Sequence, residues 1–167
     1  MTDNPTLDTA DYSREIVAKT IRPGLSDHLE LVFEDPKADK RGEPVPGDEP
    51  SDWPPLVVTS LAGSGRVLYP HVVLSEQGDD AEQIDHRKRF SQHNFSVGVE
   101  IHGQTSTEMF NLRGLVRGWF LDNRALLRDA GLAEIELSGA PASWDRDSQT
   151  ASWELTVTGL LHTHPDA

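Results

Sequence analysis

The residues of this chain best suited to metal or acid–base chemistry are its seven histidines, and they are scattered. The His162-Thr163-His164 triplet would place two imidazoles on one face of a strand, an arrangement that binds Zn²⁺ or Ni²⁺. The spacing indicates no third ligand. A metal-dependent hydrolase that uses His162 and His164 therefore remains an alternative, and the leading expectation is a protein with no catalytic residues, no cofactor and no metal.

Other reactive residue types also lack the spacing that chemistry requires. Asp145 and Asp147 alternate with an arginine beside a predicted turn, which is typical of a solvated hairpin tip. The Gly63-Ser64-Gly65 turn is not followed by the Lys-Ser or Lys-Thr pair of a phosphate-binding loop. The sequence contains no HExxH or GxSxG motif and no calcium-loop spacing. We therefore expect a protein that is not an enzyme.

Composition narrows the class of protein further. The chain has 167 residues, 28 acidic against 15 basic, and a formal charge of −13. Such a surface repels itself unless salt screens it, so we interpret it as adaptation to high salt. The one dense basic run, residues 86–89, is too small for specific nucleic-acid binding. No apolar stretch is long enough to span a membrane, no export signal is recognisable, and there are no cysteines. We expect folding in a cytoplasm.

The most regular part of the chain is the block from Phe95 to His162. The stretch 89–103 alternates as a half-buried strand that is long enough to project beyond its sheet. Thr105 and Glu108 form a capping-box pattern, and apolar residues recur at helical spacing up to Gly131. Strands follow at 133–137 and 153–159. The predicted fold class is α+β, an antiparallel or mixed β-sheet packed against one long α-helix.

The first third of the chain predicts additional elements. Residues 1–10 read as a flexible arm, and a short N-terminal helix is expected to stop at the Pro23-Gly24 pair. Residues 34–55 are rich in Pro, Gly and charge and predict a long loop or insertion. Short strands are expected at 56–61 and 69–74. The domain assignment is one α+β domain over 11–163, with a C-terminal tail at 164–167.

The order of these elements resembles the tail terminator, or tail-completion, proteins that join head to tail in tailed viruses. The resemblance is carried by DYSREIVAKTI, YPHVVLSE, FSVGVEIHGQTSTEMFNLRGLVRGWF and the closing hairpin IELSGAP…WDRDSQTASWELTVTG. It implies a structural virion protein that forms a homohexameric ring, terminates the tail tube and contacts tube and neck proteins. The acidic composition then suggests a virus of a halophilic, archaeal host. Another head–tail connector or a minor capsid protein is the alternative within this class.

A ring of this kind needs surfaces that meet different surfaces on the next copy. The projecting strand can add to a neighbour's sheet edge, and exposed aromatic residues can anchor the contact. DNA would pass through an acidic lumen without specific binding. Besides loop 36–55 and the terminal arms, the predicted assembly residues are Arg89, Phe90, His93, Phe95, Val97, Val99, Ile101, Trp53 and Trp144.

Overall fold

The computed structural model describes residues 14–47, 51–59, 68–76, 81–82, 91–147 and 149–163. It contains a seven-stranded mixed sheet in the order β1-β2-β4-β7-β5, with β3 paired to β4 and β6 paired to β7. The strands are β1 (Val57–Thr59), β2 (His71–Glu76), β3 (Ala81–Glu82), β4 (Ser91–Gly103), β5 (Leu132–Gly139), β6 (Ser143–Asp145) and β7 (Thr150–Thr163). The β1–β2 pair is parallel and the other pairs are antiparallel. The α+β prediction is confirmed.

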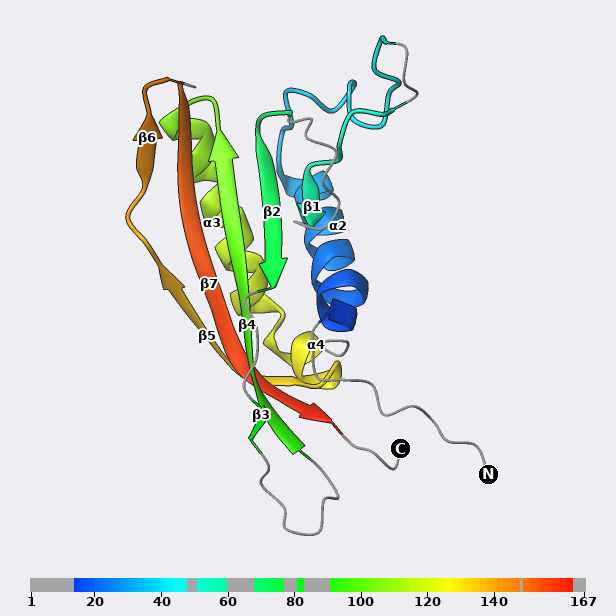
Figure 1. Cartoon of the computed structure of the whole chain (residues 1–167), viewed down its shortest axis with the longest axis vertical. Helices are drawn as coiled ribbons and strands as arrows, with labels where there is room; N and C mark the ends of the chain where they lie inside the picture. Colours follow the sequence, from blue (N-terminus) through cyan, green and yellow to red (C-terminus); the bar gives the residue numbers. More distant parts are fainter. Residues whose placement is uncertain are drawn as a thin grey trace.

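Helices cover one face of this sheet (Figure 1). The π-helical turn η1 (Val17–Ile21) leads directly into α2 (Arg22–Val32), and α3 (Ser106–Asp122) is followed by α4 (Arg124–Asp129). Helix α3 packs across β4 and β7, whereas α2 packs against β1 and α3. The core lies between these two layers. None of the helices in the described part of the chain is long and apolar enough to cross a membrane.

Helix α3 begins where the sequence predicts. Thr105 is the N-cap, and its hydroxyl accepts a hydrogen bond from the backbone N–H of Glu108 at 3.1 Å. The carboxylate of Glu108 accepts from the backbone N–H of Gln104 at 3.0 Å, one residue before the usual partner in a capping box. The predicted apolar stripe is buried, and its members are Met109, Leu112, Val116, Trp119, Phe120 and Leu127.

The predicted helix up to Gly131 is observed with one interruption, at Asn123. The side-chain amide of Asn123 donates to the carbonyl oxygen of Trp119 at 2.8 Å, and the Asn123 backbone (φ −112°, ψ 27°) leaves the helical region. The chain therefore changes direction before α4, which packs against β5. Gly131, with φ +106°, ends the helical segment as expected, because glycine adopts this conformation without strain.

The prediction that Pro23-Gly24 ends the N-terminal helix is wrong. The chain stays helical through both residues to Val32. Pro23 lies in the first turn of α2, where a missing N–H is tolerated, and the preceding π-helical turn pairs the N–H of Arg22 with the carbonyl of Val17. Residues 29–32 form the last turn of α2, and Phe33 is extended.

Candidate assembly surfaces

Four of the nine predicted assembly residues belong to the core of the chain. Phe95, Val97, Val99 and Ile101 project from β4 toward the helices and are 0–1% exposed. Because the helical layer already covers them, their side chains are unavailable to a neighbouring copy, and the prediction for these four is corrected. Period-two alternation identifies a buried face but does not distinguish a core from an interface.

The remaining predicted residues have different positions. Arg89 and Phe90 lie outside the described residues, and His93 is described only as a backbone position in β4. Trp144 is 50% exposed on β6, next to the predicted turn at Asp145–Asp147. In this turn the N–H of Asp147 donates to the carboxylate of Asp145 at 2.9 Å, which agrees with a solvated hairpin tip. Trp144 therefore remains a candidate contact residue.

The predicted projection of β4 beyond its neighbour is observed. Every residue of β4 pairs with β7, from Ser91↔Thr163 to Gly103↔Ala151, whereas the last pair with β2 is Glu76↔Val97. Residues 91–96 therefore extend past β2 while still paired with β7, and β7 in turn pairs with β5 as far as Leu161. Among the described residues, β3 pairs with Gln92 and His93 on the other edge of this part (Figure 1). Within the described part of the chain this edge of β4 is only partly paired, and such an edge is a site where another chain can add.

The Pro- and Gly-rich loop is anchored at its base by an ion pair. Arg41 and Asp35 contact each other with side chains only 9% and 12% exposed. The Arg41 guanidinium also donates to the carbonyl oxygens of Pro54 and Pro70. Arg41 thus links Asp35 and Pro54, near the two ends of the loop, to Pro70, which directly precedes β2. The sequence predicts the loop but gives no sign of this anchor.

Beyond Arg41 the described flanks of the loop pair with each other, and the segment 43–52 that they enclose is named here the acidic arm. Backbone hydrogen bonds join the N–H of Trp53 to the carbonyl of Glu43 at 2.9 Å and the N–H of Val45 to that of Ser51 at 2.8 Å. Lys40 lies over the predicted contact residue Trp53, 5.3 Å from the ring centroid. The arm extends from the β1 side of the sheet (Figure 1). It carries four carboxylate residues and no Lys or Arg.

A cluster of rings lies beside the anchor. His71 and His102 stack with centroids 4.6 Å apart, and Tyr69 meets His71 edge-on at 4.8 Å. Burial chiefly lowers the pKa of His71 from 6.5 to about 4, and the positive charges of His102 and Arg41 act in the same direction. The neutral ring is therefore a packing element near pH 7. Among the described residues, no group of three metal-ligating side chains is found, and the side chains of His162 and His164 lie outside them.

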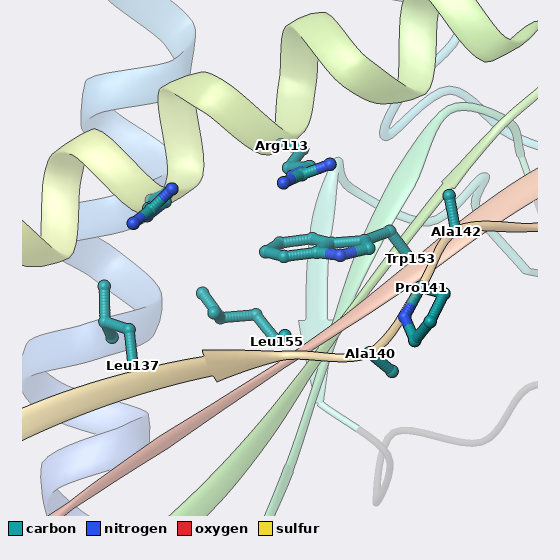
Figure 2. A pocket seen from close by; sticks show the side chains of 9 residues that line it. Arg113, Leu137, Ala140, Pro141, Ala142, Trp153 and Leu155 are labelled. Carbon is teal, nitrogen blue, oxygen red and sulfur yellow. The ribbon is translucent and has the colours of Figure 1, made fainter.

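At the opposite edge of the sheet, a pocket of about 360 Å³ lies between α3 and the β5–β7 pair. Its floor is apolar, formed by Trp153, Leu155 and Leu137 with the small residues 140–142 that link β5 to β6 (Figure 2). Arg113 lies flat against the indole of Trp153, with its Cζ atom 4.3 Å from the ring centroid. Arg117, one helical turn further along α3, also lines the pocket.

The pocket is basic in a chain that is otherwise strongly acidic. Within the described part of the chain, no carboxylate lies within ion-pair distance of Arg113 or Arg117. An apolar floor beneath two guanidinium groups binds acidic or aromatic groups through charge-assisted hydrogen bonds and stacking. The sequence shows the two arginines at helical spacing, but nothing in it predicts that β7 places Trp153 beneath them.

Comparisons with known proteins identify no family. No protein-family profile matches the sequence, and no curated protein matches it. Among solved structures, the chain is similar to one from a structure titled "Virion of native gene transfer agent (GTA) particle". The match has 12% sequence identity and a TM-score of 0.42, and it covers 88% of this chain and 98% of the other. Similarity at this level assigns neither a family nor a function.

Proposed function

We propose that this chain is a structural virion protein that assembles into a ring at the head–tail junction of a tailed virus. The observation that carries the proposal is the projecting part of β4, which continues past β2 and whose outer edge is only partly paired within the described part of the chain. The order of elements supports it as well, since a long strand, a capped helix and a closing hairpin follow one another as in tail terminator proteins.

A second feature favours a ring over a symmetric dimer. The two edges of the sheet carry unlike surfaces, with the acidic arm on the β1 side and the basic pocket on the β5 side. Unlike surfaces meet in heterologous contacts, and such contacts close into a ring when the rotation per copy divides a full turn. In this proposal, the ring ends the tail tube and joins it to the neck, and its partners are tube and neck proteins.

In this proposal, the acidic composition determines how ring assembly depends on salt concentration. A subunit with a net charge of −13 repels its own copies in dilute buffer. Screening shortens the range of the repulsion to about 3 Å at about 1 M salt. Ring formation should therefore be promoted by salt, as expected for a virus of a halophilic host.

Sedimentation analysis of the purified full chain tests the proposal. The chain is compared in about 0.1 M and about 2 M KCl, and negative-stain images are recorded from both samples. We expect one closed species with a defined copy number in high salt and smaller species in low salt. A chain that stays monomeric in both salts over a wide concentration range, or that forms only open filaments, contradicts ring assembly.

A further inference from the structure

We propose that the pocket beneath Arg113 and Arg117 is the receptor for the acidic arm, residues 43–52, of a neighbouring copy of the chain. This inference rests on the proposed ring and names the contact that closes it. The pocket is lined by two arginines, one of which lies over an indole, and the arm is a segment of the same chain with complementary charge.

The pocket has the chemistry of a carboxylate site. Arg113 is held in place by the face of Trp153 at 4.3 Å and by Phe110 at 5.6 Å. A guanidinium fixed by stacking loses little conformational freedom when it binds a carboxylate. Arg117 is exposed at the rim. No described carboxylate lies within ion-pair distance of either arginine.

The arm has the matching properties. Residues 43–52 read EPVPGDEPSD, with four carboxylates and three prolines in ten residues. The described part is braced by backbone hydrogen bonds and by the Arg41–Asp35 anchor, and Glu43 and Asp52 are exposed. Flanks that are already paired lose little entropy on binding, and proline rings stack well against aromatic and apolar floors.

The topology prevents the arm from reaching the pocket of its own chain. The arm leads into β1 at one edge of the sheet, and β5 borders the pocket at the other edge, with β2, β4 and β7 between them (Figure 1). An arm and a pocket on opposite edges of one sheet produce a head-to-tail contact between copies. This is the heterologous contact that ring closure requires.

Charge reversal on the full-length chain tests the assignment. Arg117→Glu alters the pocket, and the double substitution Asp48→Lys with Glu49→Lys alters the arm. We expect each variant alone to remain folded by circular dichroism and to lose high-salt ring assembly by tenfold or more in association constant. Mixing the two variants pairs each altered surface with its complement and should restore the ring. Rings that form equally well with either variant alone would overturn the assignment.

Peptide binding separates this assignment from ring formation itself. A labelled peptide of residues 43–52 should bind the full-length wild-type chain, and Arg117→Ala should weaken this binding about tenfold. The matched peptide with Asn and Gln in place of Asp and Glu should bind at least tenfold more weakly. Equal binding of both peptides, or stronger binding of a peptide of residues 1–13, overturns the assignment.

The two failures are distinguishable. If wild-type rings form and the 43–52 peptide does not bind, the pocket assignment is wrong and the proposed ring stands. If the peptide binds specifically and the chain never self-associates, the pocket accepts acidic arms and the ring proposal is wrong.

Discussion

Gly24 of α2 faces the indole of Trp119 on α3 at a distance that leaves no room for a side chain. A Cβ atom at position 24 would lie 2.6 Å from Cζ2 of Trp119, closer than real contacts allow. Trp119 is 3% exposed and belongs to the core, so the ring cannot move into solvent. This close approach explains why a glycine stands within a helix that continues through it.

Replacing Gly24 by alanine should destabilise the chain by about 1–3 kcal/mol, because the added methyl group overpacks the α2–α3 contact. The free energy of unfolding is measured by urea titration. Gly114→Ala is the matched control, since a Cβ atom at position 114 would meet nothing within 4 Å and alanine favours a helix. The control should be neutral or stabilising by up to about 1 kcal/mol. Equal effects at the two positions would show that the Trp119 contact is unimportant.

The Arg41–Asp35 anchor predicts a second effect on stability. Arg41→Ala leaves a nearly buried carboxylate and two carbonyl groups without their donor, so we expect a loss of about 2–3 kcal/mol. Trypsin should then cleave after Lys37 and Lys40 faster than in the wild-type chain. Lys19→Ala serves as the control, because its ion pair with Glu15 is exposed and contributes about 0.5 kcal/mol or less. Unchanged proteolysis in Arg41→Ala would contradict the anchor.

His71 predicts a dependence of stability on pH. The unfolded chain protonates this imidazole near pH 6.5, whereas the folded chain does so only near pH 4. Between these values the unfolded state binds more protons, so the contribution of His71 makes stability fall as the pH drops through this window. Above pH 6.5 the imidazole is neutral in both states, so His71 contributes no pH dependence to the stability. The difference in unfolding free energy between wild type and His71→Gln should therefore change with pH, whereas a constant difference contradicts the shift.

The net charge predicts that salt stabilises the folded chain. With a charge of −13, raising KCl from about 0.1 M to about 2 M should raise the melting temperature, because repulsion between carboxylates is screened. A control series near pH 4.8, the isoelectric point of the sequence, should show a much smaller rise. A melting temperature that is independent of KCl at neutral pH would argue against an acidic surface adapted to salt.

The sequence predicts the fold well where a local pattern determines it. The capping box at Thr105, the apolar stripe of α3 and the alternation of β4 and β7 each depend on neighbouring residues, and each is observed. Predictions fail where the local structure depends on a contact with a residue far along the chain. Gly24 reads locally as a helix stop, but it fits against Trp119, which lies on a different helix far along the chain.

The candidate surfaces show the same limit. The projection of β4 follows from its length, but the burial of Val97 and Val99 depends on the helices that cover them. The pocket requires α3 to place Arg113 above Trp153, which lies on β7 with α4, β5 and β6 between them in the chain. Spacing along one strand or helix does not contain that information, so the sequence predicts the projection of β4 but not the pocket.

The most direct test of the proposed function is electron microscopy of particles assembled by the parent virus without this chain. The account predicts unjoined heads and tails or over-long tails, and it predicts that added wild-type protein restores joining. Protein carrying Arg117→Glu should fail to restore it. Normal, joined virions in the absence of the chain would contradict the proposal.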